Sequence, residues 1–137
     1  MTQRRFDWPE RLAALIEERR FAPFVWGVHD CAMFAADAVE RQTGVDPLAQ
    51  WRGTYNSEET GDAILGGVSL TMFMDAALLA VGATRVEASM SQRGDFVILD
   101  VGNMPTCGVC LGGSVAAPGA DRLHFLPPRM IRQAWAI

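Results

Sequence analysis

Residues 24–39 read FVWGVHDCAMFAADAV, and this stretch decides how the rest of the chain is interpreted. An irregular, aromatic-rich segment leads to Asp30, a residue type that caps helix N-termini. The residues from Cys31 onward then follow the spacing of one buried helical face, with small or apolar side chains at Cys31, Phe34, Ala35, Ala38 and Val39. The sequence therefore predicts a helix that begins at Cys31, with the thiol in its first turn and facing the core.

The predicted position of Cys31 has a chemical consequence. Backbone N–H groups and the helix dipole favour negative charge at a helix N-terminus. Such a position lowers a thiol pKa and raises the fraction of thiolate, which is the nucleophilic form. Peptidase chemistry also needs a base within hydrogen-bond reach and a polar group that orients this base. The alternative interpretation is that Cys31 is a small buried hydrophobic residue.

Length, composition and charge exclude several classes of protein. A chain of 137 residues, half of them hydrophobic, predicts a single domain over residues 1–137 with a proper core. The net charge is −4 and the arginines are not clustered, which argues against nucleic-acid binding. We expect no membrane span and no signal peptide, because charge or glycine interrupts every apolar stretch. Three cysteines, an odd number, argue against a disulfide-stapled secreted domain.

Helical patterns occupy the first part of the chain. Asp7 is expected to cap a helix that ends before Pro23, with Glu10 at the capping-box spacing. A brief helix is expected over residues 57–65 and a longer one over residues 69–81, which ends near Gly82.

After Gly82 the pattern changes from helix to strand. Short apolar runs separated by Gly, Pro and Asn predict strands at 95–100, 106–111, 114–117 and 122–126. Neighbouring short strands of this kind form an antiparallel meander. The sequence predicts an α+β fold in which the N-terminal helices pack on a small antiparallel sheet.

Three short motifs, in this order, resemble one known family. Residues 26–31 (WGVHDC) resemble the nucleophile motif of NlpC-type cysteine peptidases, and 94–97 (GDFV) and 107–112 (CGVCLG) resemble two of their strands. The family has a papain-like fold and cleaves the peptide stems of bacterial cell walls. The resemblance implies that Cys31 holds the nucleophile position. It also implies that the cleft-lining or binding residues include Trp26, Asp30, Asp95 and Thr106.

The chain departs from the family at both positions that support the nucleophile. Aligned on the family pattern, Thr106 stands where the catalytic histidine belongs, and the third polar residue falls near Ala116. The only histidines in the chain are His29 and His124, and either is a candidate for a substitute base. The resemblance therefore implies a kept nucleophile, Cys31, whose partners are lost, and leaves enzymatic activity open.

The remaining cysteines permit a competing interpretation. Cys107 and Cys110 have the C-x-x-C spacing of metal or redox motifs. Residues three apart in a strand point to opposite faces, however, so the two thiols converge only if the segment turns. We expect no metal and no cofactor. A metal-binding or redox module that uses Cys107 and Cys110 is the third hypothesis.

Small NlpC-like proteins with this layout resemble components encoded in the tail clusters of phages and gene transfer agents. The first hypothesis is a degenerate domain in a tail tip or baseplate, made in the bacterial cytoplasm, which docks other tail proteins. The second is a working peptidase or amidase that acts on cell-wall peptide through Cys31. Docking requires exposed aromatic residues, for which the candidates are Trp8, Trp51, Tyr55 and residues 135–137.

Overall fold

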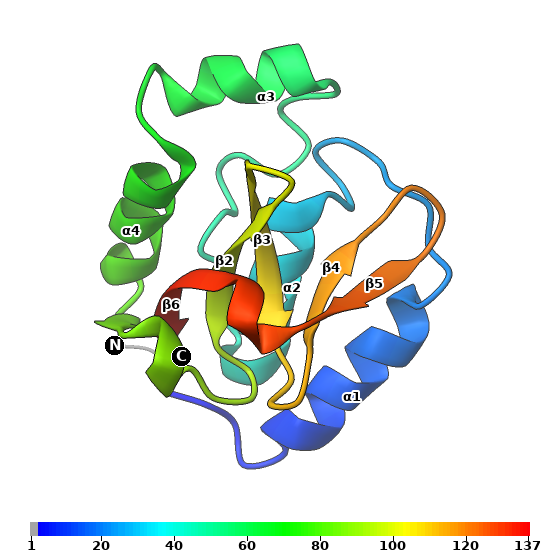
Figure 1. Cartoon of the computed structure of the whole chain (residues 1–137), viewed down its shortest axis with the longest axis vertical. Helices are drawn as coiled ribbons and strands as arrows, with labels where there is room; N and C mark the ends of the chain where they lie inside the picture. Colours follow the sequence, from blue (N-terminus) through cyan, green and yellow to red (C-terminus); the bar gives the residue numbers. More distant parts are fainter. Residues whose placement is uncertain (1–2) are drawn as a thin grey trace.

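The computed structural model describes residues 3–137 and contains helices that pack on one antiparallel sheet (Figure 1). The fold is thus the mixed type that the sequence predicts, with the α-helices first and the strands of the sheet after them. The helices are α1 (Trp8–Arg19), α2 (Cys31–Thr43), α3 (Glu58–Leu65) and α4 (Leu70–Ala80). The strands are β1 (Thr84–Val86), β2 (Phe96–Val101), β3 (Met104–Cys110), β4 (Val115–Pro118), β5 (Leu123–Leu126) and β6 (Ile131–Ala136).

The sheet contains the expected meander and two further strands. Its order is β1-β6-β2-β3-β4-β5, so β2 to β5 are neighbours both in the chain and in the sheet. The C-terminal strand β6 returns to lie between β1 and β2, antiparallel to both. Neither β1 nor β6 was expected from the sequence, because β1 is short and β6 (IRQAWA) lacks a regular alternation of apolar residues.

The main core lies between α2 and the sheet. Phe34 on α2 and Phe96 and Ile98 on β2 are almost completely buried in one cluster. Val97 and Leu99 alternate with them along β2 and belong to a second cluster on the other face of the sheet. Because β2 and β3 are buried on both faces, the side chains near Cys31 are held by tight packing.

At the helix N-termini, Asp7 holds the predicted N-cap position of α1 but its side chain does not cap the helix, whereas the predicted cap at Asp30 is confirmed. Asp7 makes no cap bond to α1, because its carboxylate instead accepts a hydrogen bond from Arg11 Nε at 2.9 Å. Asp30, Ser57 and Ser69 accept backbone hydrogen bonds at the starts of α2, α3 and α4. The caps place the beginnings of three helices where the sequence predicts them.

Helix α3 stands apart from the sheet, at the edge of the molecule (Figure 1). It contributes no buried residue to the core. No single helix within residues 3–137 has the length and apolarity to cross a membrane; only α3 and α4 taken together do, and the pair is bent by 65°.

The C-terminal aromatic residue is part of the core. Trp135 on β6 is completely buried, and its indole Nε1 donates a hydrogen bond to Asp75 on α4 at 2.9 Å. Its prediction as an exposed docking residue is therefore wrong. Trp51 and Tyr55, by contrast, remain partly exposed.

Candidate functional site

Asp30 organises the approach to Cys31. Its carboxylate accepts hydrogen bonds from the backbone N–H groups of Met33 (2.8 Å) and Gly27 (2.9 Å) and from the Tyr55 hydroxyl (2.5 Å). These bonds cap α2, fold the preceding loop and bring Tyr55 beside the nucleophile position. Burial and the hydrogen bond to Asp30 raise the pKa of Tyr55, which keeps the phenol protonated as a donor.

Gly27 allows this close arrangement. Its φ angle is +78°, in the left-handed region that favours glycine. A Cβ atom at this position would lie 2.2 Å from the Tyr55 carbonyl oxygen, so a side chain would push the loop away from the 53–55 segment.

The side chain that faces Cys31 is another thiol, Cys107 of β3. Cys31 packs against the core cluster that contains Cys107. The neighbouring Cys107 side chain lowers the pKa of the Cys31 thiol and the backbone N–H groups of Cys107 and Ala32 act in the same direction, whereas burial and the Asp30 charge act against them. The neighbouring Cys31, together with burial, raises the pKa of Cys107. Cys31 is therefore the member of the pair that ionises first.

Strand alternation explains why Cys107 occupies this place. Cys107 pairs with Ile98 of β2, and both side chains belong to the core cluster under α2. Thr106 precedes it in an extended strand and so points to the other face; its hydroxyl donates to the Met104 carbonyl at 3.3 Å. The family alignment placed Thr106 opposite the nucleophile, whereas the structure brings Cys107 there. The alternation that puts Cys107 and Val109 on the core-facing side of the strand was the sequence signal that could have identified Cys107 as the neighbour of Cys31.

A cavity of about 210 Å³ opens above the Cys31 thiol. Its walls include four aromatic side chains, Trp26, Trp51, Tyr55 and Phe73. In the described part of the chain, the charged residues that line it are all acidic: Asp30, Glu58 and Asp62. The predicted binding residues Trp26 and Asp30 therefore do lie at the cavity, together with Trp51, Tyr55 and α3, which the sequence did not place there.

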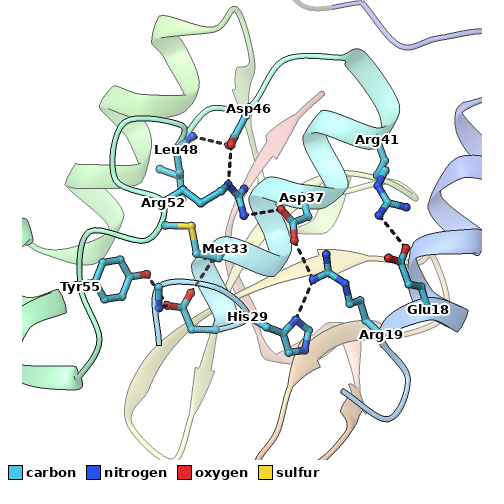
Figure 2. Close-up of polar contacts among 12 residues, drawn as sticks. Glu18, Arg19, His29, Met33, Asp37, Arg41, Asp46, Leu48, Arg52 and Tyr55 are labelled. Carbon is cyan, nitrogen blue, oxygen red and sulfur yellow. Dashed lines mark hydrogen bonds and ion pairs between the residues drawn. The ribbon is translucent and has the colours of Figure 1, made fainter. Parts of the chain in front are cut away.

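His29 lies two residues before Cys31, but its imidazole faces α1. His29 Nδ1 accepts a hydrogen bond from Arg19 Nη1 at 3.1 Å (Figure 2). Its ring packs edge-on against Phe34. Arg19 also pairs with Asp37, which pairs with Arg52 at 2.7 Å. His29 thus belongs to an ion-pair network beside α2. Burial and the Arg19 charge lower the pKa of His29.

The other predicted site residues lie away from the thiol pair. His124 is an exposed residue of the edge strand β5, paired with Ala117 of β4. Asp95 is buried, pairs with Arg4 at 3.0 Å and accepts from the Gln92 N–H, so it holds the start of β2. Within residues 3–137, neither histidine donates or accepts a hydrogen bond at Cys31.

Cys107 and Cys110 do not form a joint site. Cys107 belongs to the cluster under α2 and Cys110 to the cluster on the opposite sheet face, where its thiol lies 3.9 Å from Ser91 Oγ. Within the described residues, no group of three or more His, Cys, Asp or Glu side chains is arranged to hold a metal ion. The cysteine pair in space is Cys31 with Cys107, not the C-x-x-C pair.

This arrangement supplies a nucleophile without the rest of a hydrolytic site. Cys31 has donors that stabilise its thiolate, and a cavity gives access to it. Papain-like hydrolysis also needs an imidazole that takes the thiol proton and returns it to the leaving amine. The neighbouring Cys107 thiol is held protonated and does not replace an imidazole.

The comparisons with known proteins agree with this fold. Residues 3–137 match the model of a family described as a domain of unknown function, DUF6950. The chain belongs to this family. Among solved structures it is similar to the NlpC/p60 domain of the peptidoglycan hydrolase SagA, with a TM-score of 0.57 and 16% identity over 93% of this chain and 97% of the other. At this identity the similarity establishes an NlpC-like fold alone. A search of curated proteins gives no match.

Proposed function

We propose that this chain is a non-hydrolysing NlpC-like domain that serves as a structural component of a phage-type tail tip or baseplate. One observation carries the first half of this proposal: the thiol at the nucleophile position faces Cys107 and has no imidazole partner within residues 3–137. General-base assistance typically contributes roughly 10²–10⁴-fold in rate. The tail setting is supported by the resemblance to small NlpC-like proteins of tail gene clusters.

The cavity above Cys31 is the proposed docking site for another tail protein. Aromatic walls favour an apolar segment, and the acidic rim favours a segment that also carries positive charge. Glu58 and Asp62 have no ion-pair partner within the described residues, so their charge is available to a ligand. A lysine or arginine with an apolar neighbour fits this lining.

A working cysteine peptidase or amidase that acts on cell-wall peptide is the second candidate. It is favoured by the donors that lower the pKa of Cys31, because a thiolate attacks carbonyl groups. Within residues 3–137, however, this candidate lacks an imidazole at Cys31 that would give a proton to the leaving amine.

Peptide release from purified peptidoglycan separates the two candidates. We expect the native chain and Cys31→Ala to release the same background amount, while an active NlpC-type hydrolase, assayed in parallel, releases stem peptides. Release that depends on Cys31 contradicts the non-hydrolysing proposal.

Docking is tested by incorporation into tail particles. The double variant Glu58→Lys and Asp62→Lys reverses the charge of the cavity rim and should lower the amount of the chain in purified particles. Glu59→Lys changes the same helix outside the cavity lining and should leave incorporation unchanged. Equal incorporation of the double variant and the native chain overturns the docking site.

A further inference from the structure

Cys31 and Cys107 differ in their access to solvent. Cys31 is partly exposed and lines the cavity, whereas Cys107 is completely buried behind it in the core cluster. Their side chains are neighbours in the packing between α2 and β3. The third cysteine, Cys110, lies on the opposite face of the sheet. The pair therefore consists of one thiol that a small solute reaches and one that only the first thiol reaches.

We propose that Cys31 and Cys107 are a redox-active dithiol, in which a hydroperoxide oxidises Cys31 and Cys107 then forms a disulfide with it. This chemistry requires neither the tail role nor hydrolysis, and it uses the same cavity while no docked partner occupies it.

The chemistry balances in two steps. The Cys31 thiolate attacks one oxygen of the hydroperoxide ROOH; the O–O bond breaks, ROH leaves after taking a proton, and Cys31 becomes a sulfenic acid. The Cys107 sulfur then attacks the Cys31 sulfur; the S–O bond breaks, and the hydroxyl leaves as water with the Cys107 proton. A dithiol reverses the change by thiol–disulfide exchange and is itself oxidised to a disulfide.

The surroundings suit each cysteine to its step. Cys31 stands in the first turn of α2, and the nearby N–H groups of Cys107 and Ala32 favour its thiolate. The cavity of about 210 Å³ admits a small peroxide. Cys107 is shielded from the cavity and is held as a thiol until Cys31 is oxidised. Helix α2 packs directly on β3, so the two cysteines lie on elements that face each other.

The first test uses the native chain and needs no variant. After treatment with a small excess of hydrogen peroxide, intact mass should fall by two hydrogen atoms, and accessible thiols in denaturant should fall from three to one. Peptide mapping without reduction should join the peptides of Cys31 and Cys107, and dithiothreitol should restore all three thiols. A disulfide that contains Cys110, a disulfide between two chains, or a sulfinic acid at Cys31 without any Cys31–Cys107 link overturns the proposal.

Variants test the order of the steps. In Cys107→Ser the sulfenic acid at Cys31 should accumulate and be trapped by dimedone, whereas the native chain should give little adduct. The matched control Cys110→Ser should form the disulfide at the native rate. Equal dimedone trapping in the native chain and Cys107→Ser removes Cys107 as the resolving cysteine. A disulfide in Cys31→Ala after the same treatment contradicts the assigned pair.

Discussion

His29 shows how a residue next to a nucleophile can serve the scaffold. Its imidazole is 4% exposed, and its Nδ1 atom is the acceptor for Arg19. The Nε2 atom is buried and has no hydrogen-bond partner within residues 3–137. Asp37 and Asp30 favour the protonated imidazole, but burial and Arg19 outweigh them and lower its pKa. The folded protein therefore favours the neutral form of His29, and protonation of His29 opposes folding.

The pH dependence of stability follows from this pKa. In the unfolded chain a histidine has a pKa of about 6.5. Because the pKa of His29 is lower in the folded protein, the unfolded state takes up this proton first as the pH falls, and the free energy of unfolding decreases. We expect His29→Gln to lose less stability than the native chain between about pH 7 and pH 5, measured by urea unfolding. His124→Gln, an exposed control on β5, should keep the native slope. If the free energy of unfolding changes with pH equally in His29→Gln and in the native chain, His29 is not the source of the pH dependence.

The two cysteines show what could be predicted at the scale of residues. The cap at Asp30 and the first-turn position of Cys31 follow from local spacing, and both are found. The partner of Cys31 depends on strand alternation, in which a shift of one residue exchanges the two faces of a sheet. Alignment with a family motif favoured Thr106, whereas the alternation of Cys107 and Val109 favoured Cys107. Motif similarity does not fix the register that brings residues together.

Helices and strands differ in how much of them was predictable. The N-caps of α2, α3 and α4 are local signals, and the helices begin next to them. Strands β1 and β6 are stabilised by pairing with distant segments, since β6 pairs with both β1 and β2. Their own residues carry little strand pattern. Strands that depend on non-local pairing are therefore the elements that the sequence did not predict.

The caps predict an order of stabilities among three substitutions. Ser69→Ala removes one cap bond from α4 and should cost about 1 kcal/mol in the free energy of unfolding. Asp30→Ala should cost more, because it also leaves the Gly27 N–H and the Tyr55 hydroxyl without their acceptor. Asp7→Ala should cost least, since Asp7 makes no cap bond and only a surface ion pair. Urea unfolding checks the order, and a larger loss for Asp7→Ala than for Ser69→Ala contradicts it.

At the scale of the whole molecule, the fold joins distant parts of the chain at one site. The helix that carries Cys31 comes from the first third of the sequence, and β3, which carries Cys107, comes from the last third. Segment 48–55, α3, α4 and Trp26 supply most of the remaining walls of the cavity. The α+β order and the NlpC-like fold could be predicted from the sequence, but the site that they build has a thiol where hydrolysis needs an imidazole. We infer a domain that keeps the shape of a hydrolase and uses its cavity for docking.

The pH dependence of Cys31 alkylation tests the pairing of Cys31 with Cys107 most directly. Iodoacetamide labelling of Cys31, followed by peptide mass spectrometry, should show a midpoint below about 8.5, the ordinary pKa of a free cysteine. Cys107→Ala removes the thiol that lowers this pKa and should move the midpoint upward, although the backbone N–H groups of position 107 and Ala32 remain. His29→Gln and His124→Gln should leave the midpoint where it is. A midpoint that moves with either histidine and not with Cys107 would contradict the account.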